Sequence, residues 1–227
     1  MSRYDKAKVK IIKPCERTKK LEEVCRRLWK NNFDDSTEYI SFYFSDRWKE
    51  STTIIYGEES MLHLNPYRMQ IFGSEKTIYY IVGVCTDKAY RHRGYMDALL
   101  RESFRYLYEN DAPFVYLMPA DEKIYLPYDF TNVYTVNSFE IVSRNGERKN
   151  VDHKLLAAGY DKIAQNEIKA AVYAEMSSNE IEVIGYAELS EKQKAEFIIR
   201  SEKIMSEIFD CYVKRDEFYF EQKNREM

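Results

Sequence analysis

Two arginines and a glycine follow the end of an apolar run in the sequence. Residues 82–96 read VGVCTDKAYRHRGYM, so Arg91, Arg93 and Gly94 stand between a polar turn and the start of a helical pattern. The first turn of a helix leaves backbone N–H groups unpaired and carries the positive end of the helix dipole. Such a turn beside two guanidinium groups predicts an anion-binding site, and charge and geometry alone allow any phosphate.

The composition is typical of a globular protein. A chain of 227 residues, 44% of them hydrophobic, is long enough for one sizeable domain or slightly more. The formal net charge of −3 disfavours general electrostatic attraction to nucleic acid, so a basic site must be local. The aromatic share of 15% is more typical of a core and of pocket walls than of a platform for bases. We therefore expect no nucleic acid partner.

The sequence also indicates a cytoplasmic protein without a membrane segment. The first residues, MSRYDKAKVKIIKP, lack the apolar core of a signal peptide, and no run approaches the roughly 18 apolar residues of a membrane helix. The cysteines form no CxxC pair, and no histidine stands at metal-ligand spacing, so we expect reduced thiols and no metal site. These cysteines are Cys15, Cys25, Cys85 and Cys211.

Periodicity predicts helices that flank a sheet. Apolar residues at helical spacing predict a helix over 18–32, and Asp35 with Glu38 forms a capping-box pattern ahead of a second helix. Arg93 opens a third helix, which ends near Asn110. A short helix is expected at 121–127 because Pro127 ends it. The predicted strands are 52–56, 59–64, 67–72, 79–85 and 113–118, followed by a β-rich stretch at 133–143.

This order of elements predicts a mixed α/β fold. The central sheet is mostly antiparallel, with one parallel strand–helix–strand crossover, flanking helices and a C-terminal helical extension. The arginine motif lies in that crossover. Because ligands bind at the carboxyl ends of parallel strands, the topology and the charge predict the same place for the site.

The crossover resembles the cofactor motif of the GCN5-related N-acetyltransferase (GNAT) superfamily, Arg/Gln-x-x-Gly-x-Gly/Ala. Residues 91–96, RHRGYM, fit that pattern except at Met96, which replaces a small residue. The flanking segments SMLHLNPY at 60–67 and LMPADEKIYLPYDF at 117–130 resemble the Eis-like branch, which often carries a larger apolar residue at the position of Met96. The resemblance covers roughly residues 21–134.

The resemblance implies that acetyl-CoA is the co-substrate. Its pyrophosphate would lie on the loop and first helical turn, and backbone N–H groups from Val82 to Val84 would polarise the thioester carbonyl. The implied cofactor-binding residues are Val82, Val84, Arg91, His92, Arg93, Gly94, Tyr95 and Met96.

The resemblance further implies that Tyr125 protonates the departing coenzyme A thiolate. A phenol with a pKa near ~10 can give a proton to a thiolate whose conjugate acid has a pKa near ~8.5 if the transfer is concerted. The alternative is a tyrosine of the core, since the chain has 20 tyrosines. We expect Tyr128 and Phe130 to have packing roles.

The acceptor is expected to be the primary amine of a small molecule, such as an aminoglycoside-like antibiotic, or of a peptide. Asp34 and Asp35 can attract a cationic amine, although helix capping also explains Asp35. His63 lies on a strand that either floors the acceptor site or is exposed, and Tyr39 belongs to a pocket wall or to the core. For the base that accepts the amine proton, Glu59, Asp34, Asp35 and solvent all remain open.

The chain is expected to divide into an acetyltransferase domain at 1–150 and an extension at 151–227. Ser190 and Gln193 form a capping box that opens a helix, after a possible helix at 163–176 and a strand at 181–186. The end of the chain resembles the opening of the middle domain of Eis-like proteins, so the chain is either a fragment or a short form. The apolar face of the last helix predicts docking on the first domain or self-association, which makes a homo-oligomer possible.

Two function classes follow from the sequence. The first is an N-acetyltransferase that uses acetyl-CoA. The alternative is a non-catalytic acetyl-CoA-binding or interaction module, left by the loss of later domains. Both classes predict acetyl-CoA binding at residues 91–96, and only the first predicts turnover.

Overall fold

The computed structural model describes residues 4–133, 141–142, 148–149 and 186–226. Contacts divide the chain into two units, residues 1–118 with 190–226, and residues 119–189 with Met227. Each unit is described by itself. The predicted domains at 1–150 and 151–227 stay a prediction.

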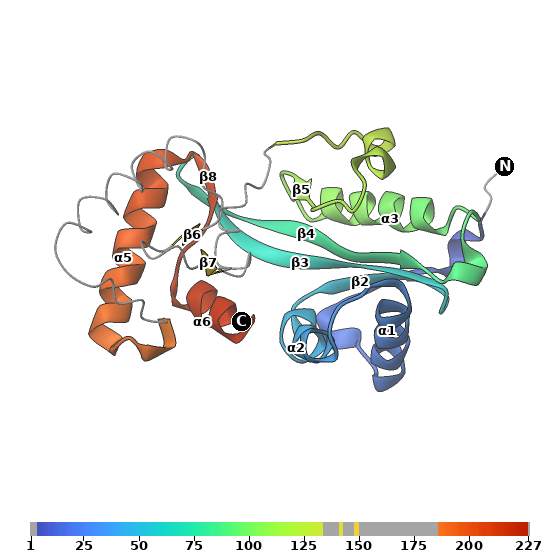
Figure 1. Ribbon diagram of the computed structural model, residues 1–227. Helices are drawn as coiled ribbons and strands as arrows, with labels where there is room; N and C mark the ends of the chain where they lie inside the picture. Colours follow the sequence, from blue (N-terminus) through green and yellow to red (C-terminus); the bar gives the residue numbers. More distant parts are fainter. Residues whose placement is uncertain (1–3, 134–140, 143–147, 150–185, 227) are drawn as a thin grey trace. The chain divides into compact units, whose positions relative to one another are not determined.

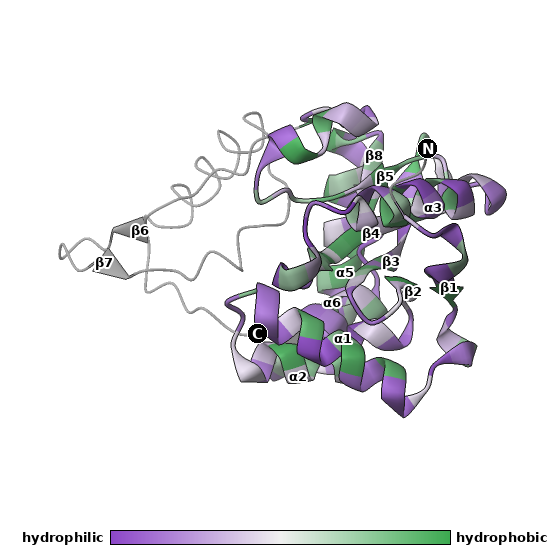
Figure 2. Ribbon diagram, turned by 90° about the vertical axis from the view of Figure 1, so that its right-hand side faces the viewer, coloured by the Kyte–Doolittle hydropathy of each residue, from purple (hydrophilic) through white to green (hydrophobic). Residues whose placement is uncertain are grey.

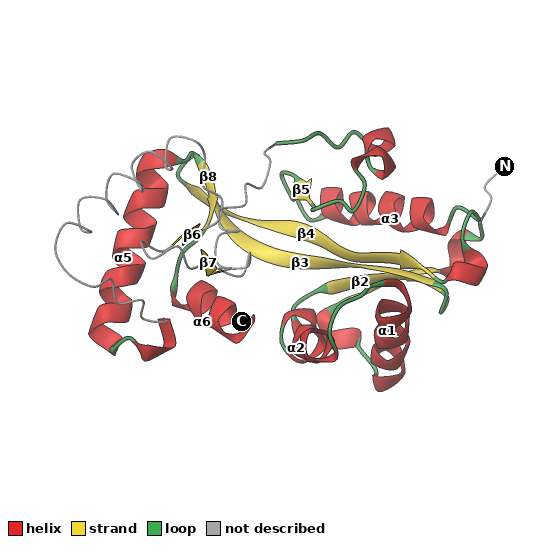
Figure 3. Ribbon diagram, in the orientation of Figure 1, coloured by secondary structure: helices red, strands yellow, loops and turns green. Residues whose placement is uncertain are grey.

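The first unit is built on a six-stranded sheet, which confirms the predicted mixed α/β fold (Figures 1 and 3). Neighbouring strands are antiparallel from β1 to β4, and β4 pairs with β5 in parallel. A sixth strand, β8, pairs with the far end of β3. The strands are β1 (Val9–Ile12), β2 (Thr52–Tyr56), β3 (Ser60–Ile71), β4 (Ser74–Thr86), β5 (Val115–Tyr116) and β8 (Cys211–Val213).

Helices cover both faces of this sheet. Helices α1 (Lys19–Asn32) and α2 (Thr37–Ser45) lie against one face, and α3 (Tyr95–Glu109) lies against the other (Figure 1). The chain ends with α5 (Glu191–Ile208) and α6 (Glu217–Glu226). No helix in the described part of the chain is both long and apolar enough to cross a membrane. Short 3₁₀ turns lie at Lys6–Lys8, Pro14–Glu16, Arg47–Lys49 and Lys88–Tyr90.

Helix α1 confirms the amphipathic pattern read from the sequence. Thr18 caps its start by accepting a hydrogen bond from the Leu21 N–H. Figure 2 shows hydrophobic and hydrophilic residues along this helix. The apolar residues are buried against the sheet, where they form one core cluster with the rings of α2. Its buried residues are Leu21, Val24, Cys25, Leu28 and Trp29.

The predicted cap of α2 is wrong. Ser36 is the capping residue, because its side chain accepts from the Tyr39 N–H. The Asp35 carboxylate instead accepts a hydrogen bond of 2.8 Å from the Trp29 indole N–H. Asp35, which the capping pattern predicted as the cap, therefore holds a core tryptophan, and its neighbour Ser36 caps the helix.

Two predicted strands are one long strand. Asn65 and Pro66 suggested a break, yet β3 runs through both. The Asn65 side chain is buried, and its oxygen accepts hydrogen bonds from the Tyr43 and Ser51 hydroxyls at 2.9 and 2.5 Å. These bonds satisfy a polar side chain inside the sheet, where it would otherwise be costly.

Other boundaries also differ from the prediction. Strand β4 begins earlier than expected, β5 has only two residues, and β1 was not predicted. Helix α3 begins at Tyr95 and not at Arg93, because Gly94 takes a left-handed conformation (φ 82°) as its cap. The capping box of Ser190 and Gln193 is confirmed at the start of α5.

A β-bulge interrupts the long β3–β4 ladder. Met61 faces Cys85 and His63 faces Val82, so two residues of β4 lie opposite Leu62 alone. One of the two is Gly83, with φ 66°. A Cβ atom on Gly83 would lie 2.8 Å from the Trp29 ring and 3.1 Å from the His63 ring. The bulge therefore requires glycine for its backbone and for its packing.

The second unit has only short described elements. Two 3₁₀ turns, Glu122–Ile124 and Leu126–Tyr128, replace the single predicted helix at 121–127. Strand β6 (Ile141–Val142) pairs with β7 (Arg148–Lys149), and a further 3₁₀ turn covers Tyr186–Glu188. The predicted helix at 163–176, nearly all of the strand at 181–186 and most of the β-rich stretch lie outside the described residues.

We expect Gly83→Ala to destabilise the protein strongly. The left-handed backbone costs an alanine about 1–2 kcal/mol, and overpacking against Trp29 and His63 adds about 1–3 kcal/mol. Urea unfolding of the purified variant measures the loss.

Gly73→Ala is the matched control for this prediction. Gly73 has a similar φ of 76°, but a Cβ atom added there would meet no heavy atom within 4 Å, so only the backbone cost applies. Equal losses in the two variants would contradict the packing role of Gly83.

Candidate functional site

Strands β4 and β5 pair over two positions and then separate. The parallel pairs are Tyr79 with Val115 and Tyr80 with Tyr116. From Ile81 to Thr86, β4 keeps β3 on one side and has no strand on the other within the described residues. The carboxyl end of β4 thus offers an open backbone edge to a ligand.

The bulge lies on this open part of β4. Val82 and Val84, the two predicted sources of backbone donors, flank Gly83 and are half-buried. A bulge disrupts the ladder locally and turns the strand, and bulges are common beside active sites. The sequence analysis missed the bulge, although an isolated glycine in a strand pattern was the signal for it.

The loop that follows β4 leads directly into α3. The Asp87 carboxylate accepts from the Ala89 N–H and fixes the 3₁₀ turn. His92 and Gly94 then take positive φ angles of 63° and 82°. The cap residue of α3 is a glycine, which has no side chain to bond the N–H groups of the first turn, so these groups can hold an anion.

Arg91 and Arg93 lie on either side of this turn. Arg91 donates to the Asn32 side-chain oxygen at 2.9 Å and to the Thr86 carbonyl at 3.3 Å. Arg93 donates to the Ala89 carbonyl at 3.2 Å. Both guanidinium groups are exposed, and neither has an ion pair in the described part of the chain. Their charge is therefore available to a phosphate.

The remaining predicted cofactor residues have mixed exposure. His92 is exposed, and Tyr95 and Met96 are half-buried in the first turn of α3. Tyr95 stacks on Tyr56 with ring centroids 4.0 Å apart. This stacking packs the start of α3 against β2 and so holds the end of the loop between β4 and α3 in place.

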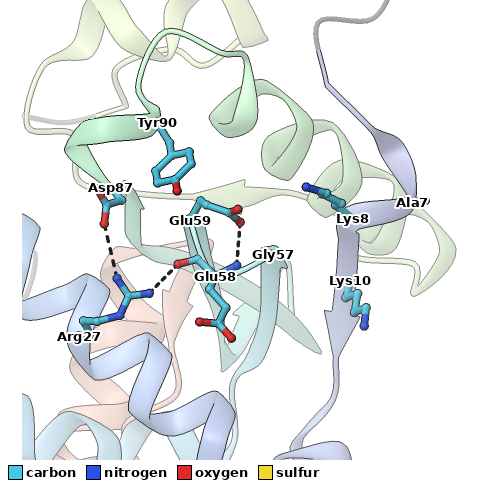
Figure 4. Close-up of a pocket in the computed structure, with 9 residues that line it drawn as sticks. All are labelled: Ala7, Lys8, Lys10, Arg27, Gly57, Glu58, Glu59, Asp87 and Tyr90. Atoms are coloured by element: carbon cyan, nitrogen blue, oxygen red, sulfur yellow. Dashed lines mark hydrogen bonds and ion pairs between the residues drawn. The ribbon is translucent and has the colours of Figure 1, made fainter.

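A cavity of about 710 Å³ lies beside the loop (Figure 4). The Arg27 guanidinium donates to the Glu58 carbonyl at 2.8 Å and lies 3.5 Å from the Asp87 carboxylate. Three basic and three acidic side chains line the cavity. The lining therefore has no net charge that would favour an anion over a cation. The lining residues are Ala7, Lys8, Lys10, Arg27, Gly57, Glu58, Glu59, Asp87 and Tyr90.

His63 lies inside the core and is 0% exposed. Its exposure was one alternative from the sequence, and that alternative is wrong. Its Nδ1 lies 3.0 Å from the Thr53 hydroxyl, which also accepts from the Trp48 indole N–H. Burial, and to a lesser degree the charge of Arg17, lowers the pKa of His63 to about 3, so the ring is neutral at physiological pH.

The other predicted acceptor residues lie around the same core. Asp35 holds the Trp29 indole, and Tyr39 is half-buried against the core cluster. The Trp29 and His63 rings are stacked at 6.0 Å. Asp34 is exposed beside Asp35 in sequence. Asp35, Tyr39 and His63 therefore share one aromatic neighbourhood, and contact with an acceptor stays a prediction for all four residues.

Tyr125 belongs to the second unit. It ends the 3₁₀ turn Glu122–Ile124, is half-buried and lies with its ring edge-on to Phe130 at 5.7 Å. This contact with Phe130 agrees with a packing role for the ring body. The acid role of its hydroxyl stays a prediction.

A family model described as an acetyltransferase (GNAT) domain matches residues 16–133, just over half of the chain. The chain therefore belongs to the GNAT acetyltransferase domain family, whose acetyl donor is acetyl-CoA. The first turn of α3, its glycine cap and the two exposed arginines fit the pyrophosphate of that donor. No curated protein matches the chain.

Three solved structures resemble the chain at low identity. A probable N-acyltransferase from Enterococcus faecalis has 18% identity and a TM-score of 0.45, over 53% of this chain and 31% of that one. A GCN5-related N-acetyltransferase from Kribbella flavida has 16% identity and a TM-score of 0.39, over 55% and 33%. A Brucella melitensis GNAT family acetyltransferase, in complex with acetyl-CoA, has 15% identity and a TM-score of 0.44, over 64% and 97%. The chain spans about a third of the length of the first two.

We expect His63 to make stability depend on acid pH. The unfolded chain protonates this ring near pH 6.5 and the folded protein only near pH 3. As pH falls through that window, the unfolded state binds the extra proton, so the free energy of unfolding decreases. The contribution is up to about 1.4 kcal/mol per pH unit. Urea unfolding at a series of pH values measures it.

His63→Gln removes the ionisable group and should flatten the pH dependence in this window, whatever its effect at pH 7. His92→Gln is the control, because His92 is exposed. A slope that is unchanged in His63→Gln would show that His63 is not the group responsible.

Proposed function

We propose that the protein is an N-acetyltransferase that transfers the acetyl group of acetyl-CoA to a primary amine of a small molecule or peptide. One observation carries the proposal. The open, bulged end of β4, the glycine-capped start of α3 and the exposed charges of Arg91 and Arg93 all lie at the carboxyl end of the same strand. This arrangement suits a ligand with both a pyrophosphate and an extended amide-bearing arm.

The chain's own residues suggest how the donor binds. N–H groups in the first turn of α3 and the guanidinium groups of Arg91 and Arg93 would hold the pyrophosphate. Backbone N–H groups at Val82 and Val84 would polarise the thioester carbonyl, because the bulge turns this part of β4 out of the regular ladder. Gly83 leaves the space beside this edge to the Trp29 and His63 rings, which a Cβ atom at this position would displace.

The transfer itself needs two proton movements. The amine nitrogen attacks the carbonyl carbon, the carbon–sulfur bond breaks, and the thiolate leaves. In the proposal Tyr125 gives its phenolic proton to that thiolate, and a base removes a proton from the amine. Glu59, Asp34, Asp35 and solvent remain the alternatives for the base. The Glu59 carboxylate accepts from the Glu58 N–H at 2.8 Å and lines the cavity of Figure 4.

We assign the chain to the Eis-like branch as part of this proposal. The support is the sequence of residues 60–67 and 117–130 and the larger residue Met96 in the cofactor motif. Met96 is half-buried at the second position of α3. A larger side chain at that position leaves the backbone N–H groups of the first helical turn unchanged, and these groups are the donors that an anion needs.

We expect Arg91→Ala and Arg93→Ala each to weaken acetyl-CoA binding by about tenfold, because each removes an exposed charge beside the pyrophosphate site. Titration calorimetry with acetyl-CoA measures the change. Arg101→Ala is the matched control, since Arg101 lies on α3 but pairs with Asp97. A loss in the control as large as in the other two would contradict a local site.

Free-thiol release from acetyl-CoA, measured over a panel of amines, tests the catalytic function. We expect Tyr125→Phe to lower kcat by about 100-fold or more, with unchanged acetyl-CoA binding, because only the proton donor is lost. Tyr128→Phe, three residues further along the chain, should keep most of the activity. Acetyl-CoA binding without thiol release from any amine would support the non-catalytic alternative, and full activity of Tyr125→Phe would exclude Tyr125 as the acid.

A further inference from the structure

A second cavity lies at a gap along the outer edge of β3. Strand β2 pairs with β3 only as far as Leu64, and β8 pairs with it only from Met69 onward. Between them is a pocket of about 310 Å³. The family model does not reach the C-terminal residues that close it. The pocket is lined by Glu50, Pro66, Tyr67, Arg68, Thr77, Val213, Lys214, Asp216, Phe218, Tyr219 and Gln222.

Two buried arginines contact tyrosines that line this pocket. Arg47 and Arg215 are each 8% exposed. Arg47 lies over the Tyr67 ring at 4.6 Å, Arg215 lies over the Tyr219 ring at 4.5 Å, and each guanidinium donates to the hydroxyl of its tyrosine. Neither guanidinium has an ion pair within the described residues, although the Glu202 carboxylate accepts a hydrogen bond from the backbone N–H of Arg215. A buried cation without a counter-ion is costly, so this pair raises the positive potential at the pocket wall.

Two hydrogen-bond donors of the pocket have no acceptor among the described residues. Gln222 is 6% exposed, and its side-chain amide makes no hydrogen bond there. The Tyr219 hydroxyl accepts from Arg215, which leaves its own proton to donate and makes it a stronger donor. An accessible amide without a partner in the described part of the chain and a polarised hydroxyl that line one pocket suit a carboxylate.

The other charges of the pocket are mostly neutralised. Arg68 pairs with Asp216, and Lys214 pairs with Glu75 at 2.6 Å. Glu50 is exposed and has no ion pair in the described part of the chain. The pocket therefore offers donors at its buried wall and the carboxylate of Glu50 at its rim. This combination suits a molecule with both a carboxylate and an ammonium group.

Tyr67 connects the pocket with the point where β4 and β5 separate. Its ring contacts Tyr80 at 6.4 Å and Tyr116 at 6.2 Å between centroids. Tyr80 and Tyr116 form the last β4–β5 pair before the open edge. Tyr67, which lines the pocket, thus directly contacts the residue pair that precedes the open edge of β4 proposed for acetyl-CoA.

We propose that this pocket binds the carboxylate of the acceptor, through Tyr219 and Gln222 with Arg47 and Arg215 behind the wall. The inference rests on the proposed acetyltransferase function. It makes the acceptor an amino acid or a peptide-like amine that carries a carboxylate near its amino group.

Three probes of similar shape test the pocket directly. Phenylalanine carries the amine and the carboxylate, 3-phenylpropanoate only the carboxylate, and phenethylamine only the amine. We expect titration calorimetry on the full chain to show phenylalanine and 3-phenylpropanoate binding at least about tenfold more tightly than phenethylamine. Tyr219→Phe and Gln222→Leu should each remove most of this preference. Tyr108→Phe, an exposed tyrosine on α3, is the control and should leave it unchanged.

Thiol release with phenylalanine and phenethylamine then separates the two proposals. Faster turnover of phenylalanine than of phenethylamine, with this preference lost in Tyr219→Phe through a higher KM for phenylalanine, supports both the acetyltransferase function and the acceptor role of the pocket. Carboxylate preference in binding with no thiol release from either amine overturns the acetyltransferase proposal and the acceptor role, but keeps the pocket as a carboxylate site. Equal binding of the three probes, no binding of the carboxylates, or an unchanged preference in both variants overturns the pocket itself.

Discussion

The geometry of the site depends on the bulge at Gly83. Two residues of β4 face Leu62 alone, and the space beside Gly83 is occupied by the rings of Trp29 and His63. A side chain at this position would displace the core or flatten the strand. The free edge of β4, the loop and the start of α3 follow directly in sequence, so their positions depend on this packing.

Directional hydrogen bonds hold the rings that support the bulge. The Trp29 indole donates to Asp35, and the Thr53 hydroxyl joins Trp48 to His63. These bonds satisfy polar atoms that burial would otherwise penalise, and they restrict how the aromatic rings can pack. The core below β4 is therefore a specific support for the backbone, and neutral His63 belongs to it.

The C-terminal segment adds a second polar region to the same sheet. Strand β8 extends the edge of β3, and α6 then brings Tyr219 and Gln222 to a gap that β2 leaves open. Arg47, just before β2, and Arg215, just after β8, are far apart in sequence, and each donates to a tyrosine of this pocket. The guanidinium groups of these two buried arginines form no ion pair within the described residues, which is the physical reason to expect an anionic ligand there.

The sequence by itself determined the class of fold, helix α1 and the capping box of α5, because these features depend on residues close together in the chain. It also predicted an anion site at Arg91 to Gly94, where the structure has the glycine-capped start of α3. Tertiary structure decided the burial of His63, the partner of Asp35 and the continuity of β3 through Pro66. It also brought Arg47 and Arg215 into contact with two tyrosines that line one pocket. Burial and pairing of this kind arise from contacts between residues far apart in sequence, which local periodicity and capping rules do not contain.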